Sequence, residues 1–351
     1  MQTVSAPEVT GARLRDNFGR VATNLRVSLT DRCSLRCTYC APPAGARCLP
    51  QRNLLRDAEF IRLITIAVRD LGVTNVRFTG GEPLLRPGVA RIVAATAALR
   101  TDAGEPPETA ITTNGIGLAQ HVAALRAAGL GRLNVSLDTL RPDRYLQITG
   151  ADRLDEVLEG LAAAQAAGLA PVKINSVLLP GVNDDEAVPL VRWALARGYQ
   201  LRFIEQMPLG RPDVWHRDEM VTAAEILAAL RAEFELEPVP ASVRGSAPAE
   251  TWIVRGADAP AGAVPTVGVI ASVTSAFCRV CDRTRLTADG QLRACLFAKD
   301  ETDVRTLLRG GASDAEIAAV WVATMRAKGP GHEIGKATYI PPQRIMRAIG
   351  G

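Results

Sequence analysis

The sequence predicts an α/β protein built on a partial (β/α)6 barrel, followed by a smaller C-terminal appendage. Three observations support this fold class: β-type runs alternate with Ala/Leu-rich helical stretches, six such units occur in the first two-thirds of the chain, and polar and apolar residues alternate within the strands. Repeated βα units indicate a parallel sheet covered by helices. Six units are too few for a closed eight-stranded barrel. A partial barrel and an open doubly wound sheet are the two choices.

Six strands are expected in the first two-thirds of the chain. They are Leu25–Thr30, Val76–Thr79, Ala110–Thr113, Arg132–Leu137, Val172–Leu178 and Leu201–Glu205. In the first of these, Arg26 and Ser28 share one face, and Val27 and Leu29 share the other. Because helices would cover the apolar face, the polar face must line a space that contains water or a polar ligand. We therefore favour a partial barrel with a polar ligand cavity inside it.

Five helices are expected between these strands. They are Asp57–Leu71, Pro87–Leu99, Leu118–Ala128, Leu154–Ala167 and Asp184–Arg197. Gly129 and Gly168 follow two of the helices, at the position where a glycine commonly ends a helix. Asn183 stands three residues before Glu186, which predicts a capping arrangement at the start of the last one.

The pattern changes from about Met207 onward. Thr222–Glu233 and a helix opening at Ser313 both begin with capping boxes, and short β-type runs lie at Thr251–Val254 and Thr266–Ile270. We therefore expect three parts: an N-terminal extension at 1–24, the partial barrel at 25–234, and a C-terminal region at 235–351 over the barrel mouth.

Composition limits the classes of function. The chain has 351 residues, of which 47% are hydrophobic and 22% charged, with a formal charge of +4. The basic residues, 37 Arg and 4 Lys, are spread along the chain, so no nucleic-acid surface is expected. No apolar run reaches the roughly 18 residues of a membrane span, and no signal-peptide pattern opens the chain. These features predict a soluble, cytoplasmic protein.

Six of the seven cysteines fall into two groups. The N-terminal triplet is Cys33, Cys37 and Cys40, spaced C-x3-C-x2-C, and the C-terminal triplet is Cys278, Cys281 and Cys295, spaced C-x2-C-x13-C. An odd count without a secretion signal argues against a disulfide framework. Three thiolates suit a four-iron cluster that leaves one iron open. The alternative is a structural zinc site, which would require a fourth ligand. Cys48 could supply one, but a spare thiol is the better interpretation.

Two motifs resemble the radical S-adenosylmethionine superfamily. The first is the N-terminal triplet, with Tyr39 directly before its last cysteine. The second is Thr79-Gly80-Gly81-Glu82-Pro83 after the second strand, which resembles that superfamily's glycine-rich methionine-binding loop. The resemblance implies that the open iron chelates the methionine part of S-adenosylmethionine. An electron from the cluster would then cleave the sulfonium to a 5′-deoxyadenosyl radical.

The C-terminal triplet, the run Arg283-Thr284-Arg285 and the final Gly350-Gly351 are similar to the GTP 3′,8-cyclase family. This resemblance implies two [4Fe-4S] clusters, S-adenosylmethionine and GTP, in the first step of molybdenum cofactor biosynthesis. The radical would take the ribose 3′-hydrogen, and C3′ would attack guanine C8, giving 3′,8-cyclo-7,8-dihydroguanosine 5′-triphosphate. The open iron of the second cluster would contact the guanine. The Gly-Gly tail would enter the active-site cavity.

The same resemblance implies the site residues. Both triplets would bind iron: Cys33, Cys37, Cys40, Cys278, Cys281 and Cys295. S-adenosylmethionine would contact Tyr39, Gly81, Ser136 and Met207. GTP would contact Arg26, Arg77, Thr112, Lys173, Arg283, Thr284 and Arg285, with Arg202 added on the phosphate side. Arg283 and Arg285 would position the substrate for catalysis, and no single acid or base is assigned.

The expected partners are GTP, an electron donor for cluster reduction, and a downstream cyclic pyranopterin monophosphate synthase that accepts the product. No membrane or nucleic acid is expected, and the chain is expected to be a monomer or homodimer. Two alternatives stay open. One is another radical enzyme with an auxiliary cluster, such as a peptide maturase, although only three cysteines follow residue 50. The other is a non-enzymatic iron–sulfur sensor or a zinc-bearing binding protein.

Overall fold

The computed structural model describes residues 13–40, 48–210, 215–334, 339–342 and 344–350. Within these residues a single curved sheet runs through the protein in the order β12-β11-β10-β1-β2-β3-β4-β5-β6-β9-β8-β7. The first twelve residues of the predicted N-terminal extension and Gly351 lie outside the described residues.

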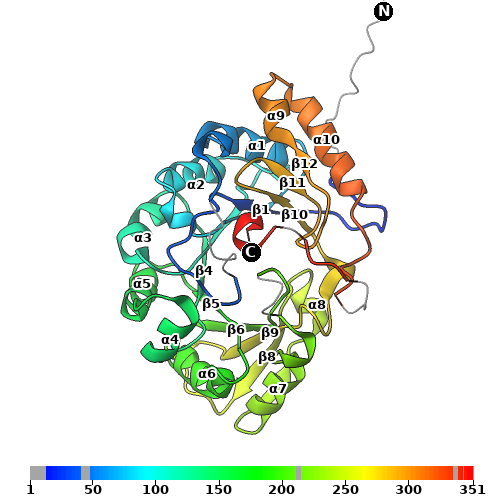
Figure 1. The fold of residues 1–351 in the computed structure, drawn as a ribbon. Helices are drawn as coiled ribbons and strands as arrows, with labels where there is room; N and C mark the ends of the chain where they lie inside the picture. The colour runs from blue at the N-terminus through cyan, green and yellow to red at the C-terminus, as the bar shows by residue number, and fades with distance from the viewer. Residues whose placement is uncertain (1–12, 41–47, 211–214, 335–338, 343, 351) are drawn as a thin grey trace, which may run out of the picture.

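The six predicted strands form the centre of the sheet. They are β1 (Asn24–Ser28), β2 (Asn75–Thr79), β3 (Glu108–Thr113), β4 (Arg132–Ser136), β5 (Lys173–Ser176) and β6 (Gln200–Ile204). Each pairs in parallel with the next. Figure 1 shows these strands curving around a central space with the helices outside, so the predicted partial α/β barrel is confirmed.

The helices follow the strands as the sequence predicts. They are α1 (Asp57–Arg69), α2 (Val89–Ala97), α3 (Leu118–Ala127), α4 (Pro142–Thr149), α5 (Leu154–Ala166) and α6 (Ala187–Ala196). The sequence analysis missed α4, which starts with a proline at its first turn and contains residues of modest helix propensity. Among the described residues, no helix combines the length and the apolar character needed to cross a bilayer.

The C-terminal strands extend both edges of the same sheet. On one side β10 (Arg283–Leu286) runs parallel to β1, and β11 (Gln291–Arg293) and β12 (Thr302–Asp303) continue from it. On the other side β9 (Thr266–Ile270) runs parallel to β6, followed by β8 (Glu250–Arg255) and β7 (Glu235–Pro238). Hydrogen bonding of the sheet therefore continues across residue 235, where we placed a domain boundary. The division into parts stays a prediction.

The alternation within the strands separates core from cavity. The apolar positions of β1, including Leu25 and Val27, are fully buried under the outer helices, as are Phe78 on β2 and Phe203 on β6. The polar positions point the other way, into the space inside the sheet. This confirms the predicted polar interior.

The remaining helices show which capping predictions hold. Capping boxes at Thr222 and Ser313 open α7 (Ala223–Arg231) and α10 (Asp314–Arg326), as predicted. Between α7 and α10 lie α8 (Ala241–Arg244) and α9 (Val304–Arg309), and α11 (Met346–Ile349) follows. The predicted cap at Asn183 is wrong. Its amide nitrogen donates to the carbonyl oxygen of Asp138 at 2.7 Å, and its amide oxygen accepts from the Leu179 N–H at 2.7 Å. Asn183 therefore ties two loops together instead of capping a helix.

Candidate active site

Two adjoining cavities occupy the inside of the sheet. The first cavity, of about 230 Å³, contains the N-terminal triplet. The second cavity, of about 380 Å³, contains the C-terminal triplet. They share part of their lining, namely Thr112, Asn175, Ile204, Met207 and Met346. A ligand in one cavity would therefore lie directly beside a ligand in the other.

The loop that carries the N-terminal triplet is held from outside by α4. The Arg36 and Thr38 N–H groups each donate at 2.9 Å to carbonyl oxygens at the C-terminal end of α4, those of Thr149 and Ile148. A third bond, from the Cys40 N–H to the Cys37 carbonyl oxygen at 3.0 Å, tightens the loop itself. The helix that the sequence analysis missed is therefore what anchors the cysteine loop at the end of β1.

The three thiols suit a cationic cluster. Burial raises the pKa of each, to about 12 for Cys40, and repulsion from neighbouring thiols raises the pKa of Cys37 and Cys40 further. Thiolates gathered without compensating charge are unfavourable, and bound iron would compensate them. Among the described residues, no group of three or more His, Cys, Asp or Glu side chains is gathered closely enough for a single metal ion.

The glycine loop packs against the segment that leads into these cysteines. A Cβ on Gly81 would lie 2.2 Å from the carbonyl oxygen of Arg32, and one on Gly80 would lie 2.5 Å from that of Thr30. The Gly81 and Glu82 N–H groups donate to these same two carbonyls, each at 2.7 Å. Only glycine allows this close approach of two backbones. The loop therefore borders the first cavity with exposed backbone instead of side chains.

Glu82 fastens this loop to the end of β3. Its carboxylate accepts from the Leu84 and Asn114 N–H groups, at 2.9 and 2.7 Å, and from the Thr113 hydroxyl at 2.7 Å. Burial raises the pKa of Glu82 to about 7, although these hydrogen bonds oppose the rise. The Asn114 amide also donates to the hydroxyl of Ser34 at 3.0 Å. One network therefore joins the glycine loop, β3 and the cysteine loop.

Tyr39 is held by Asp138, a residue that was not among the predicted site residues. Its hydroxyl donates to a carboxylate oxygen of Asp138 at 2.6 Å, and the other oxygen accepts from the Val177 N–H at 2.8 Å. Burial raises the pKa of Asp138 to about 6. Tyr39, Gly81, Ser136 and Met207, the four predicted S-adenosylmethionine contacts, all line the first cavity.

The register of the sheet builds a row of cations in the second cavity. Arg285 on β10 pairs with Arg26 on β1, and Arg26 pairs with Arg77 on β2. Neighbouring strands lie about 4.8 Å apart. The side chains of these three arginines therefore lie side by side along the same face of the sheet and line the cavity. Lys173 on β5 and Arg202 on β6 line the same cavity from its opposite side. The stem of Arg202 fits there because a Cβ on Gly268 would approach its Cγ to 2.9 Å.

The charge balance of the second cavity is strongly positive. Its lining has eight cationic side chains, Arg26, Arg77, Arg132, Lys173, Arg202, Arg244, Arg283 and Arg285, against two carboxylates, Glu108 and Asp282. Six of the seven arginines carry a buried Nε without a hydrogen-bond acceptor among the described residues, namely Arg26, Arg77, Arg132, Arg202, Arg244 and Arg283. Buried donors are normally paired. Their alignment on one cavity indicates a polyanionic ligand.

Crowding of like charges lowers the pKa of these cations. Burial is the main cause, and repulsion from neighbouring arginines adds to it, which lowers the pKa of Arg77 to about 9 and that of Lys173 to about 8. The pKa values of Arg26, Arg202 and Arg285 are lowered for the same reasons. Electrostatic energy stored in this way is released when a multiply charged anion binds.

The C-terminal triplet lines the second cavity together with residues of the barrel strands. Burial raises the pKa of Cys278. Burial acts in the same direction on Cys281, but the charges of Lys328 and Arg283 outweigh it and lower the pKa of that thiol. The donor set of three thiols is the same as in the first cavity, and it fits a four-iron cluster for the same reason.

Thr284 is the one predicted site residue whose side chain does not line either cavity. It alternates with Arg283 and Arg285 along β10, and its buried hydroxyl accepts from the Trp321 indole N–H of α10 at 2.9 Å. Contact with GTP would therefore have to come from its backbone. Cys48 is exposed, and the described lining of neither cavity includes it.

Sequence analysis missed several residues of the second cavity. Arg132 and Asn134 share one face of β4, so the alternation within that strand could have placed Arg132 on the cavity side. Arg132 forms an ion pair with Glu108 on the neighbouring strand. Arg244 has no comparable signal, because it comes from a short segment far from the triplets in sequence.

The chain end reaches the cavities through α11. Met346 lines both of them, and its N–H donates to the Leu209 carbonyl oxygen at 2.7 Å. The carbonyl oxygen of Gly350 accepts a hydrogen bond from the Arg285 guanidinium. Figure 1 shows α11 in the middle of the ring of strands. The described part of the predicted tail therefore lies against a cation of the second cavity.

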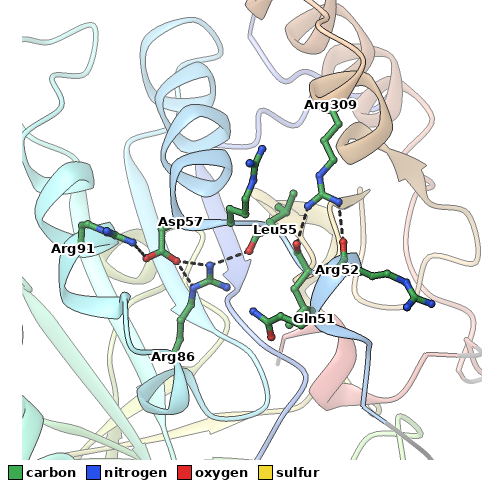
Figure 2. Close-up of a pocket in the computed structure, with 9 residues that line it drawn as sticks. Gln51, Arg52, Leu55, Asp57, Arg86, Arg91 and Arg309 are labelled. Carbon is green, nitrogen blue, oxygen red and sulfur yellow. Dashed lines mark hydrogen bonds and ion pairs between the residues drawn. The ribbon is translucent and has the colours of Figure 1, made fainter.

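A larger hollow, of about 630 Å³, opens on the outside of the barrel. Figure 2 shows three of its arginines bound within the chain: Arg86 donates to Asp57 and to the Leu55 carbonyl oxygen, Arg91 donates to Asp57, and Arg309 donates to the Arg52 carbonyl oxygen at 2.9 Å. Their hydrogen-bonding capacity is used to connect α9 to the segment before α1. This hollow therefore lacks the unpaired donors that distinguish the second cavity.

Two family profiles together match most of the chain. Residues 27–194 match the Radical SAM superfamily, and residues 199–334 match Molybdenum Cofactor Synthesis C. A GTP 3′,8-cyclase of Streptomyces coelicolor is 58% identical over 339 residues, 96% of each chain. One of Corynebacterium glutamicum is 54% identical, over 98% of this chain and 91% of that one. A protein named GTP 3′,8-cyclase 2, from Mycobacterium tuberculosis, is 57% identical, over 96% and 92%.

Solved structures share the fold at low sequence identity. Streptococcus suis SuiB bound to precursor peptide SuiA superposes with a TM-score of 0.58 at 14% identity, covering 88% of this chain and 67% of that one. SuiB alone gives a TM-score of 0.55 over 86% and 66%. At this identity the similarity concerns the fold alone.

Proposed function

The chain belongs to the GTP 3′,8-cyclase family of the radical S-adenosylmethionine superfamily, and from this membership we propose that it converts GTP to 3′,8-cyclo-7,8-dihydroguanosine 5′-triphosphate in molybdenum cofactor biosynthesis. The observation that carries the proposal is the pair of adjoining cavities. One has three thiols beside a glycine loop, and the other has three thiols beside eight cations.

Each cavity would take one iron–sulfur cluster and one small-molecule ligand. The N-terminal triplet would hold a [4Fe-4S] cluster with S-adenosylmethionine, and the C-terminal triplet would hold a second [4Fe-4S] cluster beside GTP. The residues that would hold this first cluster are Cys33, Cys37 and Cys40. Once reduced by an external donor, the cluster would supply the electron that cleaves S-adenosylmethionine, and the resulting 5′-deoxyadenosyl radical would take the 3′-hydrogen of GTP. The coarser assignment, an iron–sulfur cluster with S-adenosylmethionine, follows from membership of the superfamily.

The chain itself contributes binding, orientation and exclusion of water. The row Arg285, Arg26 and Arg77 provides bidentate donors for a triphosphate. The shared lining brings the sugar of one ligand beside the other, which is where a hydrogen atom would have to move. Three of the five shared lining residues, Ile204, Met207 and Met346, are apolar, which would limit the water beside a reactive carbon.

The test is anaerobic reconstitution with iron and sulfide, followed by incubation with GTP, S-adenosylmethionine and dithionite. Chromatography with mass detection should find the cyclised guanosine triphosphate together with at least an equal amount of 5′-deoxyadenosine. ATP in place of GTP is the matched control and should give no cyclised product. Release of 5′-deoxyadenosine without any cyclised product would favour a different radical enzyme. Formation of neither would favour an iron–sulfur sensor.

Arg283 and Arg285 are expected to bind the phosphates. Replacing either by alanine should weaken GTP binding about tenfold or more, because a charge-assisted hydrogen bond contributes on the order of 1.5–3 kcal/mol. Equilibrium dialysis with labelled GTP measures this, and GTP-independent cleavage of S-adenosylmethionine should be unchanged. The matched control is Arg279→Ala, since Arg279 is exposed in the same loop and does not line the cavity. Equal GTP affinity in all four proteins would place the phosphates elsewhere.

Lys173 predicts a pH dependence of GTP binding. Its pKa is about 8 in the free protein, because burial and the charges of Arg202, Arg132 and Arg77 disfavour the ammonium. A bound triphosphate stabilises the ammonium and raises that pKa, so binding takes up a proton and weakens as pH rises through 8. Between about pH 8 and about pH 9 the dissociation constant should rise by up to tenfold.

The control for this prediction is Lys173→Arg, which keeps its charge over the same range. Its dissociation constant should change much less between the two pH values. Calorimetric titration of wild type and variant with GTP, in buffers of different ionisation enthalpy, would also count the protons taken up on binding. An identical pH dependence in both proteins would mean that another group titrates.

An electron donor and a product-accepting cyclic pyranopterin monophosphate synthase complete the proposal, as the family membership suggests. Both would act on an enzyme whose reactive groups lie inside the barrel. The oligomeric state stays a prediction of monomer or homodimer.

A further inference from the structure

Lys328 is a buried lysine directly behind the C-terminal triplet. It follows α10, and 5% of it is exposed. Its ammonium donates to the carbonyl oxygens of Cys281 and Arg283, at 3.2 and 2.9 Å, and approaches the Sγ of Cys281 to 3.4 Å. An ammonium has three N–H donors. All three are therefore directed at one short segment, Cys281 to Arg283.

This arrangement places a full positive charge beside one particular sulfur. Removing an ammonium from water is costly unless it is paired and hydrogen-bonded. A neutral thiol is a weak acceptor, whereas a thiolate that binds iron is negatively charged and accepts strongly. The environment of Lys328 is therefore satisfied best when Cys281 serves as a ligand.

A second cation secures the neighbouring ligand. Arg20 donates to the Cys278 carbonyl oxygen at 2.7 Å and to the Pro330 carbonyl oxygen at 2.9 Å. The short segment that follows α10, residues 328–330, is therefore linked to the backbone of two successive cysteines. Of the two cations, Lys328 is the one with a donor on a ligand sulfur.

We propose that Lys328 is a positioning residue of the C-terminal triplet, which holds Cys281 in its ligating geometry and raises the reduction potential of a four-iron cluster bound there. The inference rests on the proposed function, since it assumes that the triplet binds such a cluster. Reduction adds one electron and one negative charge to the cluster. Hydrogen bonds to ligand sulfurs and nearby positive charge stabilise the reduced form and so raise the potential.

The same contacts connect the cluster to the substrate cations. Lys328 holds the carbonyl oxygen of Arg283, whose guanidinium lies in the second cavity over the Phe277 ring, 4.7 Å from its centroid. A charge at position 328 therefore fixes a cluster ligand and the backbone of a phosphate-binding arginine at once. An effect on GTP affinity alone would be explained by backbone support, so the reduction potential is the decisive readout.

The experiment isolates the second cluster in the full-length chain. Cys33, Cys37 and Cys40 are replaced by alanine, so that the C-terminal triplet is the one cluster site left. Into this background are introduced Lys328→Met, which removes the charge, Lys328→Arg, which keeps it, and Lys299→Met. Lys299 is the matched control, because it is an exposed lysine four residues after Cys295. After anaerobic reconstitution, iron is counted and the cluster is titrated with dithionite and mediators while its electron paramagnetic resonance signal is followed.

Lys328→Met should bind the same iron as its background but be harder to reduce. At the midpoint potential of the background protein, its ratio of reduced to oxidised cluster should fall about tenfold, which corresponds to a shift of about 59 mV for one electron. Lys299→Met should titrate with the background, and Lys328→Arg should lie closer to the background than Lys328→Met does.

Each contrary result has a distinct meaning. Full iron and an unchanged potential in Lys328→Met would overturn the role of Lys328 while leaving the proposed function intact. No cluster in the background protein itself would overturn the proposed function, and this inference with it. If Lys328→Met bound no iron, Lys328→Arg would decide: iron restored at the background potential supports the role of the charge, and no iron overturns it.

Discussion

Replacing Cys33, Cys37 and Cys40 together by alanine is expected to leave about half of the reconstituted iron, about four atoms of about eight, and no cleavage of S-adenosylmethionine. The three thiols line the first cavity, where we propose that they bind one cluster, and the other proposed cluster site is in the second cavity. Iron per chain is measured by a colorimetric chelator, and 5′-deoxyadenosine by chromatography. The cyclised product should be absent, since no radical is formed.

The matched control for this prediction is Cys48→Ala. Cys48 is close to the N-terminal triplet in sequence, but it is exposed and does not line the cavity. The variant should keep its iron and its activity. Loss of iron from Cys48→Ala equal to that from the triple variant would show that our assignment of the ligands is wrong. Full iron in the triple variant would show the same.

The motifs carried most of what the sequence could predict about the site. The spacing of the N-terminal triplet and the Gly80-Gly81 turn are local features, and each lies directly after a strand whose alternation is clear. Placing them at the ends of neighbouring parallel strands was enough to expect a common cavity. The family resemblance implied Arg26, Arg77, Thr112 and Lys173. Their common cavity agrees with the strand pattern, because the polar positions of parallel strands face one side of the sheet.

β10 was missed because its sequence does not resemble a buried strand. Arg283-Thr284-Arg285 is polar on both faces, yet all three residues are buried. The side chains on one face line the second cavity beside other cations, and the hydroxyl on the other face accepts a hydrogen bond from Trp321. Hydrophobic patterning cannot identify a strand whose neighbours are a charged ligand site and a hydrogen-bonding indole.

Contacts between segments that are distant in the chain also could not be predicted from the sequence. The cap predicted at Asn183 failed because its amide hydrogen-bonds to Asp138, 45 residues earlier. The bonds from α4 to the cysteine loop and from Lys328 to Cys281 likewise join segments that only the folded chain brings together. Local capping rules describe what a side chain can do, and the tertiary structure decides which partner it finds.

Deleting Gly350 and Gly351 is expected to reduce the cyclised product strongly while iron content and melting temperature stay near those of the wild type. Gly350 is buried, and its carbonyl oxygen accepts from Arg285, the first cation of the row in the second cavity. Loss of this acceptor leaves the guanidinium free to move from the position that suits GTP. Few core contacts are removed, because neither residue has a side chain. Product yield, iron per chain and thermal unfolding of the truncated protein are measured together.

A single substitution tests the same contact without shortening the chain. Gly350 has φ +85°, and a Cβ there would lie 2.7 Å from the Thr79 hydroxyl oxygen and 2.9 Å from the Ser28 Cβ. Gly350→Ala should therefore displace the tail. The matched control is Gly311→Ala, because Gly311 has nearly the same φ, +86°, but no atom within 4 Å of an added Cβ. Both variants put an alanine at a positive φ, and only Gly350→Ala also crowds the ends of β1 and β2. Two results together would contradict this prediction: equal product from the two variants and full activity of the truncated chain. They would mean that the tail does not contribute to the reaction and that other contacts hold Arg285.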